Sequence, residues 1–296
     1  MKPATFDYLR PADLAEALAL LRDLGDDVKV LAGGQSLVPM MNFRLARPAA
    51  LIDLNRIGEL AGVRRDNGTL VVGAMTRQWD VEHDPAVGSL CPVLPEALRF
   101  VGHTAVRMRG TVGGSLAHAD PAAELPVTAL ALGAEMVVAS ARTGQRRVVA
   151  ADDFFVHYFT TALAEDELLV ETRWPVERPG RGAAFCEFAL RHGDFAVCAV
   201  AAAVAIDDGL CTEARIAIGG VAPTPVRVAA AEVAVTGTTV EPAVIAAAAD
   251  AAAGGVDPSS DITAPADYRR HLVRHLTQQA LTRALVQARR PSEGEG

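Results

Sequence analysis

Apolar positions in the first 180 residues follow two spacings, one typical of helices and one of short strands. Between Pro11 and Leu24 they recur every three or four residues, which predicts an amphipathic helix that Gly25 ends. Asn67-Gly68 predicts a tight hairpin between strands at 60–64 and 69–73. The other expected elements are helices after Pro39 and at 76–82, 93–100 and 124–132, and strands at 28–31, 50–54, 135–139, 147–149 and 168–173.

A segment rich in proline and glycine, at 177–182, predicts a domain boundary. Beyond it we expect a hairpin around Asp207-Asp208-Gly209, and then helices. Hairpins without regular strand–helix alternation indicate an α+β fold. The expected strands are 198–206 and 212–218, and the helices 226–235, 243–253 and 267–287. The predicted domains are 1–177, with subdomains of about 1–55 and 56–177, and 178–290, followed by a disordered tail at 291–296.

Composition disfavours two classes of partner. Of the 296 residues, 22% are charged and the formal net charge is −8, with no dense stripe of Lys and Arg, so nucleic-acid binding is not expected. No apolar run approaches the length of a membrane span, and the N-terminus lacks the pattern of a secretory signal. We therefore expect a cytoplasmic protein without a transmembrane segment.

The four cysteines form no metal-binding or disulfide pattern. They stand at positions 91, 186, 198 and 211, and no two have the C-x-x-C spacing. His271 and His275 have the i, i+4 spacing of metal ligands, but arginines flank them and no glutamate lies between them, which favours a basic helix face. The sequence predicts no metal site, so the metal centres of any redox system would belong to other chains.

Two glycine-rich loops carry the clearest chemical signal. They cover 31–37 (LAGGQSL) and 110–121 (GTVGGSLAHADP). Paired glycines let successive N–H groups converge on an anion, and a neighbouring Ser or Thr adds a donor. Arg107 and Arg109, just before the second loop, could neutralise phosphate charge or pair with acids. Two such loops indicate a ligand with two linked phosphates held from both sides, as in a dinucleotide.

Other interpretations of these loops stay open at this point. Neither loop fits G-x-G-x-x-G or the P-loop, which disfavours a Rossmann site and triphosphate hydrolysis. The segment 113–117 approximates a nucleophile elbow, which would make Ser115 the nucleophile of a serine hydrolase, although a basic segment precedes it in place of an apolar strand. The other triad members would come from Asp152, Asp194, His271 and His275. A further alternative is a non-catalytic nucleotide-binding module.

Taken together, the motifs resemble the FAD-binding medium subunit of the molybdenum hydroxylases, the family of carbon monoxide dehydrogenase and xanthine dehydrogenase. The similarity runs along essentially the whole chain. It rests on Phe6-x-Tyr8-x-x-Pro11, the two glycine loops, Ile52-Asp53-Leu54, Gly73-Ala74-Met75-Thr76, Asp120-Pro121-Ala122-Ala123-Glu124-Leu125-Pro126, Glu167-Leu168-Leu169 and Arg191-x-Gly193-Asp194-x-Ala196.

The resemblance implies a two-subdomain FAD-binding domain of the PCMH or vanillyl-alcohol-oxidase type and a smaller α+β C-terminal domain. It implies that Glu124 faces the adenosine ribose or the ribityl chain, that Leu168 or Leu169 lies near the isoalloxazine, and that Asp194 borders the flavin end. The pyrophosphate would be bound from one side by Ala32, Gly33, Gly34, Gln35, Ser36 and Leu37, and from the other by Thr111, Gly113, Gly114 and Ser115, with Ala117 and Asp120 also at the cofactor.

The implied function is that of a flavin electron-transfer subunit with no catalytic residue for the substrate. A large partner chain would carry a molybdenum–pterin centre and a small one two [2Fe-2S] clusters, in a dimer of heterotrimers. FAD would pass electrons to an acceptor such as NAD, oxygen or a quinone. Two positions depart from the family: Ser115 stands where Asn is common, and Cys186 lies in a region where some relatives place a lysine near the flavin. The substrate stays open.

Overall fold

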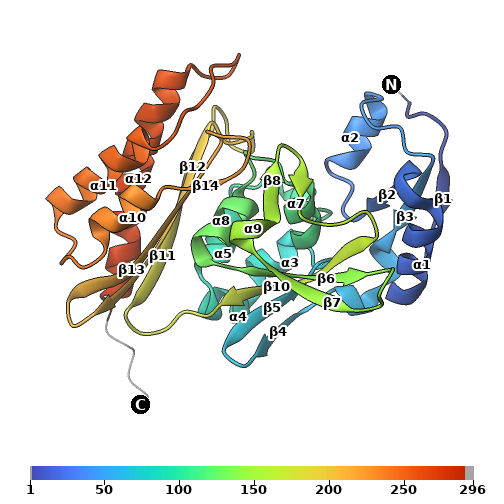
Figure 1. Ribbon diagram of the computed structural model, residues 1–296, viewed down its shortest axis with the longest axis horizontal. Coiled ribbons are helices and arrows are strands. Elements are labelled where there is room, and N and C mark those ends of the chain that lie inside the picture. Colours follow the sequence, from blue (N-terminus) through green and yellow to red (C-terminus); the bar gives the residue numbers. More distant parts are fainter. Residues whose placement is uncertain (1, 291–296) are drawn as a thin grey trace.

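The computed structural model describes residues 2–290, which form three units, each built on one sheet (Figure 1). In the N-terminal unit, β1 (Asp7–Leu9), β3 (Ala50–Asp53) and β2 (Val28–Leu31) pair in parallel in that order. Helix α1 (Leu14–Leu24) packs on them, and α2 (Leu37–Asn42) follows β2. The predicted helix begins at Leu14 because Asp13 caps it, its side chain accepting a hydrogen bond from the Glu16 amide at 2.8 Å.

The middle unit is a five-stranded antiparallel sheet with helices packed against it. Asn67 and Gly68 both have positive φ (45° and 78°), which confirms the predicted hairpin. The strand order is β4 (Val63–Asp66), β5 (Thr69–Gly73), β10 (Glu167–Pro175), β6 (Glu135–Ser140), β7 (Arg146–Ala150). The helices are α3 (Gln78–His83), α4 (Pro85–Leu90), α5 (Val93–Leu98), α6 (Thr104–Arg107), α7 (Val112–His118), α8 (Glu124–Leu132) and α9 (Ala151–Phe154), and β8 (Phe155–His157) pairs with β9 (Thr160–Thr161).

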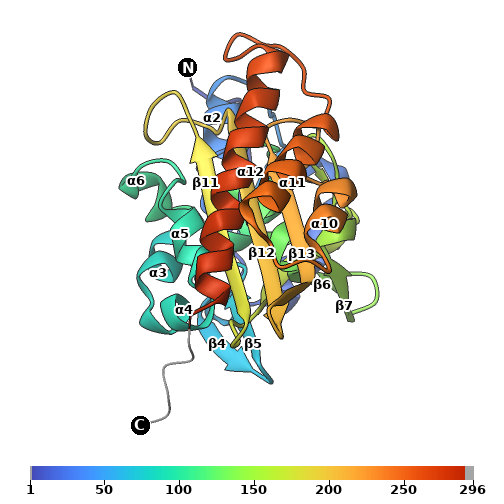
Figure 2. The same cartoon turned by 90° about the vertical axis from the view of Figure 1, so that its left-hand side faces the viewer.

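The C-terminal unit is a four-stranded antiparallel sheet with one face covered by helices (Figure 2). Its strands are β11 (Arg181–Phe188), β12 (Cys198–Asp207), β13 (Leu210–Gly219) and β14 (Val226–Arg227), and its helices are α10 (Ala229–Val235), α11 (Pro242–Gly254) and α12 (Ala266–Ala288). The predicted helix at 226–235 is wrong over its first residues, because Val226 and Arg227 pair with β13. The tail predicted at 291–296 lies outside the described residues.

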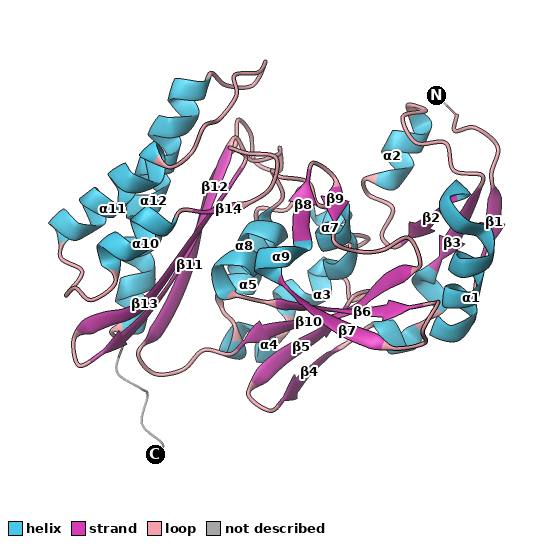
Figure 3. Ribbon diagram, viewed as in Figure 1, coloured by secondary structure: helices cyan, strands magenta, loops and turns pink. Residues whose placement is uncertain are grey.

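Strand β11 was not expected from the sequence, and it joins the middle and C-terminal units. Its residues alternate between two faces. Phe185 packs into the core of the middle unit, whereas Ala184 and Cys186 pack beneath α12. Gly182 lies against the backbone of α12 at Ala284, where no Cβ would fit. The mixture of hairpins and grouped helices confirms the α+β class (Figure 3).

Candidate cofactor-binding site

The two glycine loops, far apart in the sequence, are in backbone contact. A Cβ on Gly33 would meet the Arg109 carbonyl oxygen and would lie 2.7 Å from the Gly110 Cα. A Cβ on Gly114 would lie 3.3 Å from the Cβ of Ala32. Only glycine at position 33 allows this approach, so the loops form one structure at the junction of the N-terminal and middle units.

The two loops are tied together by a pair of side chains that the sequence analysis did not single out. Arg77 donates from Nη1 to the Arg109 carbonyl and from Nη2 to Asn55 Oδ1, both at 2.6 Å. Asn55 in turn donates from Nδ2 to the Ala32 carbonyl at 2.9 Å. Because these contacts join residues far apart in the chain, no local motif signals them.

The first loop presents unpaired backbone donors. Between β2 and α2 the chain turns at Gly34, whose φ of 75° suits glycine. The amides of Gly33, Gly34, Gln35 and Ser36 have no hydrogen-bond acceptor among residues 2–290. Four consecutive free N–H groups before the first turn of a helix form an environment that favours an anion.

The backbone amides of the second loop, unlike those of the first, are bonded within the protein. Its glycines begin α7, where Thr111 is the N-cap and its Oγ1 accepts from the Gly114 amide at 3.0 Å. The Gly113 amide donates to the Ala74 carbonyl at 2.8 Å, and the Ser115 amide to the Thr111 carbonyl at 3.1 Å. These three amides therefore bond within the protein, and the glycines here allow α7 to pack closely on its neighbours.

A cleft of about 610 Å³ opens beside the first loop, within the size range of cofactor sites. Burial lowers the pKa of the Arg77 guanidinium, and the positive charge of Arg109 lowers it further. These two neighbouring cations are an environment that an anionic ligand would stabilise. The lining residues are Tyr8, Arg10, Leu31, Ala32, Gly33, Gly34, Gln35, Val38, Pro39, Asp53, Asn55, Arg77 and Arg109.

Asp53 is the one acidic residue in the lining of this cleft, and it is held in place by its neighbours. Its side chain is buried and accepts hydrogen bonds from the Tyr8 hydroxyl and from the Asn55 amide. Burial acts to raise the pKa of the carboxyl, but the hydrogen bonds outweigh burial and hold the pKa below its ordinary value. Asp53 therefore orients Asn55 and, through it, the first loop.

Several predicted site residues lie away from the lining of this cleft. Glu124 is buried at the start of α8, Leu168 and Leu169 are buried in β10, and Asp194 is exposed between β11 and β12. Gly113, Gly114, Ser115 and Ala117 lie within α7, Thr111 is its N-cap, and Asp120 follows its C-terminal end. The cleft is therefore lined by residues of the first loop. The second loop adjoins the first through the contact between Gly114 and Ala32.

The arrangement needed for a serine hydrolase is not assembled. Ser115 lies inside α7 with its amide bonded to Thr111, and not at a strained turn after a strand. No hydrogen bond joins Ser115 to a histidine within the described chain. Asp152 forms ion pairs with Arg215 and Arg227. The hydrolase interpretation therefore has no structural support.

Cys186, noted in the sequence as a departure from the family near the flavin, does not lie on the face of β11 that packs against the middle unit. Its side chain is beneath α12, with Arg283 Nη1 3.5 Å from its Sγ. In the register of β11 with β12, Glu187 pairs with Ala199, which packs in the core of the middle unit. The side chain of Glu187, which was not singled out from the sequence, therefore points toward the middle unit.

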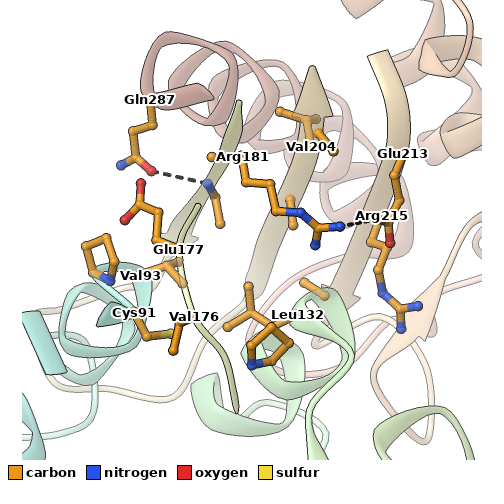
Figure 4. A pocket seen from close by; sticks show the side chains of 17 residues that line it. Cys91, Val93, Leu132, Val176, Glu177, Arg181, Val204, Glu213, Arg215 and Gln287 are labelled. Atoms are coloured by element: carbon orange, nitrogen blue, oxygen red, sulfur yellow. Dashed lines mark hydrogen bonds and ion pairs between the residues drawn. The ribbon is translucent and has the colours of Figure 1, made fainter. Parts of the chain in front are cut away.

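A second cavity lies between the middle and C-terminal units (Figure 4). Its volume of about 70 Å³ is room for a few water molecules. Arg181 and Glu213 form a 3.2 Å ion pair at its wall, and Gln287 Oε1 accepts from the Ala183 amide. This cavity is too small to hold a dinucleotide.

Comparison with known proteins establishes the class of this chain. Residues 4–177 match the family model described as the FAD binding domain in molybdopterin dehydrogenase, and residues 183–284 match the CO dehydrogenase flavoprotein C-terminal domain. The chain belongs to the family of FAD-binding flavoprotein subunits of molybdopterin dehydrogenases.

Individual relatives match the chain over nearly its full length. It is 42% identical to the 6-hydroxypseudooxynicotine dehydrogenase complex subunit alpha of Paenarthrobacter nicotinovorans, covering 99% of both chains. It is 38% identical to the carbon monoxide dehydrogenase medium chain of Hydrogenophaga pseudoflava, covering 96% of this chain and 98% of that one. A solved structure of carbon monoxide dehydrogenase from that organism, lacking the Mo-pyranopterin moiety, superimposes with a TM-score of 0.93 at 40% identity, over 97% and 99% of the two chains.

Two further features concern membrane spans and metal ligands. Over residues 2–290, no helix combines the length and apolar character that a membrane span requires. The same residues contain no cluster of three or more His, Cys, Asp or Glu side chains able to hold a metal ion. All four cysteines are buried free thiols.

Proposed function

We propose that the FAD of this flavoprotein lies along the junction of the N-terminal and middle units, with its pyrophosphate against the two glycine loops. The observation that carries this proposal is the set of four free amides at 33–36, next to Arg77 and Arg109. A diphosphate supplies the acceptors and the negative charge that these groups lack. The close contact at Gly33 brings the second loop to the same place.

The residues proposed to hold FAD are given first for its sugar and ring and then for its pyrophosphate. Glu124 is proposed to face its ribose or ribityl hydroxyls, Leu168 or Leu169 to lie near the ring, and Asp194 to border the flavin end. Ala32, Gly33, Gly34, Gln35, Ser36 and Leu37 are proposed on one side of the pyrophosphate, and Thr111, Gly113, Gly114 and Ser115, with Ala117 and Asp120, on the other.

This chain's contribution to the reaction is to bind and orient the cofactor. When bound, FAD accepts and releases electrons singly or in pairs. The two loops fix the phosphates, and the buried sheet residues exclude water from the adjoining wall. No residue of this chain is proposed as an acid or base toward the substrate of the complex.

We propose partner chains in keeping with those of the relatives. The relative named as a subunit of the 6-hydroxypseudooxynicotine dehydrogenase complex supports assembly into a multi-subunit enzyme. The proposed partners are a large molybdenum-binding subunit and a small [2Fe-2S] subunit, arranged as a dimer of heterotrimers. The proposed domains are 1–177, with a division near 55, and 178–290. The cytoplasmic location stays a prediction of the sequence.

The proposal is tested by purifying the complex and measuring its visible absorption and its acid-released flavin. We expect flavin bands and about one FAD per copy of this chain. A colourless complex in which an esterase probe labels Ser115 would replace the proposal with the hydrolase. A complex with bound nucleotide but no flavin would favour the non-catalytic module.

A further inference from the structure

Two glutamates lie near each other at the contact between the middle and C-terminal units. Glu124 is the first residue of α8 and is only 7% exposed. Glu187 is near the end of β11, and α8 packs against β12 and β13 of the same sheet. The register of β11 directs Glu187 to the side of the middle unit, with Phe185. The two glutamates therefore come from different units and lie on the same side of the C-terminal sheet. On that side Ala199, the neighbour of Glu187, pairs with Gly219, and Gly219 packs against Val127 of α8.

Neither carboxyl forms an ion pair among residues 2–290, and the nearby cations are held by other groups. The Oε2 atom of Glu187 is buried and has no hydrogen-bond partner in the described chain. Arg107, whose charge acts on Glu124, forms a 2.7 Å ion pair with Glu82 and donates to two backbone carbonyls. On the C-terminal side, Arg269 donates to two other carbonyls at 2.7 Å and pairs with an aspartate.

Two carboxylates without a counter-ion in a poorly solvated place do not both ionise near neutral pH, because each charge is desolvated and repels the other. Burial and the charge of Glu124 raise the pKa of Glu187 to about 9. Burial, with Asp120, raises the pKa of Glu124 to about 7, and Arg107 opposes this rise. The Cys198 thiol is the other titratable group beside Glu187, and burial raises its pKa to about 12.

We propose that Glu124 and Glu187 form a carboxyl pair that holds a proton at neutral pH, and that Glu187 in its neutral form is a positioning residue in the wall of the flavin site. The location beside the flavin rests on the proposed function. The proton-holding pair itself does not, since it stands on the burial, the missing partner of Oε2 and the occupied arginines.

The pair makes stability depend on pH in a defined direction. The pKa of each glutamate is higher in the folded chain than in the unfolded one. At any pH between these two pKa values, the folded chain therefore binds more protons than the unfolded chain. Stability therefore falls as pH rises toward about 9, where Glu187 ionises. Negative charge added at the flavin end would favour the protonated pair, and by linkage ionisation of the pair would disfavour that charge.

The test uses the full-length chain within its complex, as wild type, Glu187→Gln and Glu124→Gln, with Glu213→Gln as a matched control. Glu213 is an exposed glutamate of β13, away from the pair. Infrared absorption of a protonated carboxylic acid is recorded at neutral pH. The melting temperature and the flavin midpoint potential are measured from about pH 7 to above pH 9, across the range in which the pair titrates.

We expect the carboxylic-acid band in the wild type and in Glu213→Gln, and a weaker band in Glu187→Gln, in which only Glu124, with a pKa of about 7, still holds part of a proton. The variant's melting temperature should fall less steeply with pH, and its flavin potential should match the wild type near neutral pH and diverge above about pH 9. Absence of the band, or the same pH profiles in Glu187→Gln and wild type, would overturn the pair. Absence of FAD with the band present would instead overturn the proposed function alone.

Discussion

Replacing Gly33 by alanine tests how the two loops are joined. The added methyl would meet the Arg109 carbonyl and lie 2.7 Å from the Gly110 Cα, where ordinary contact begins at 3.4 Å. The loops must therefore move apart by at least about 0.7 Å, and the atoms that resist are backbone atoms that do not rotate away. Overpacking of this kind costs about 1–3 kcal/mol of stability.

The same movement should weaken FAD binding, because the amides at 33–36 would no longer point at one anion. Loss of one hydrogen bond to a charged group is worth about 1.5–3 kcal/mol, which corresponds to a roughly 10- to 150-fold weaker affinity. The dissociation constant is measured by titrating FAD into flavin-depleted complex and following the quenching of flavin fluorescence. The flavin content after gel filtration gives a second, independent readout.

Gly88→Ala is the matched control. Gly88 lies in α4, and a Cβ there meets no atom within 4 Å. This variant should keep the wild-type affinity for FAD and gain up to about 1 kcal/mol of stability from the better helix propensity of alanine. If Gly33→Ala binds FAD as tightly as Gly88→Ala, the proposed role of the loop contact is refuted.

Three further substitutions test other parts of the account. Arg77→Ala removes two hydrogen bonds that join the loops and should weaken FAD binding about tenfold, whereas exposed Arg146→Ala should not; equal dissociation constants would contradict this. An esterase probe should label neither Ser115→Ala nor the wild type, and labelling of the wild type alone would contradict this. Arg269→Met leaves the buried Val197 carbonyl and the half-buried Gly220 carbonyl without their donor and should lower the free energy of unfolding by about 3 kcal/mol, measured in urea; an unchanged midpoint would count against the role of Arg269.

Local patterns predicted much of the fold because they depend on neighbouring residues. The Asn67-Gly68 turn requires two positive φ angles, and those residue types permit them. The helix Glu124–Leu132 was predicted with its observed bounds. Strand β11 was missed because proline and glycine at 179–182 indicate a linker, whereas Gly182 is there to let α12 pack against the strand.

Some features of the candidate site could likewise be predicted from neighbouring residues, whereas others could not. The first glycine loop was visible in the sequence, since its free amides follow from its own backbone. The tie from Arg77 through Asn55 was not, because it joins residues that only the folded chain brings together. Helix α7 was also missed, since paired glycines are poor helix formers. The choice between Cys186 and Glu187 depends on strand register, which one residue of shift reverses.

The amides of the first loop are proposed to hold the diphosphate of FAD where the second loop meets them. The most direct measurement is a density map of the FAD-loaded complex that resolves the cofactor. We expect phosphate oxygens within hydrogen-bond distance of the amides at 33–36, with Arg77 and Arg109 alongside. A diphosphate bound elsewhere on the chain, with those amides facing only solvent, would contradict it.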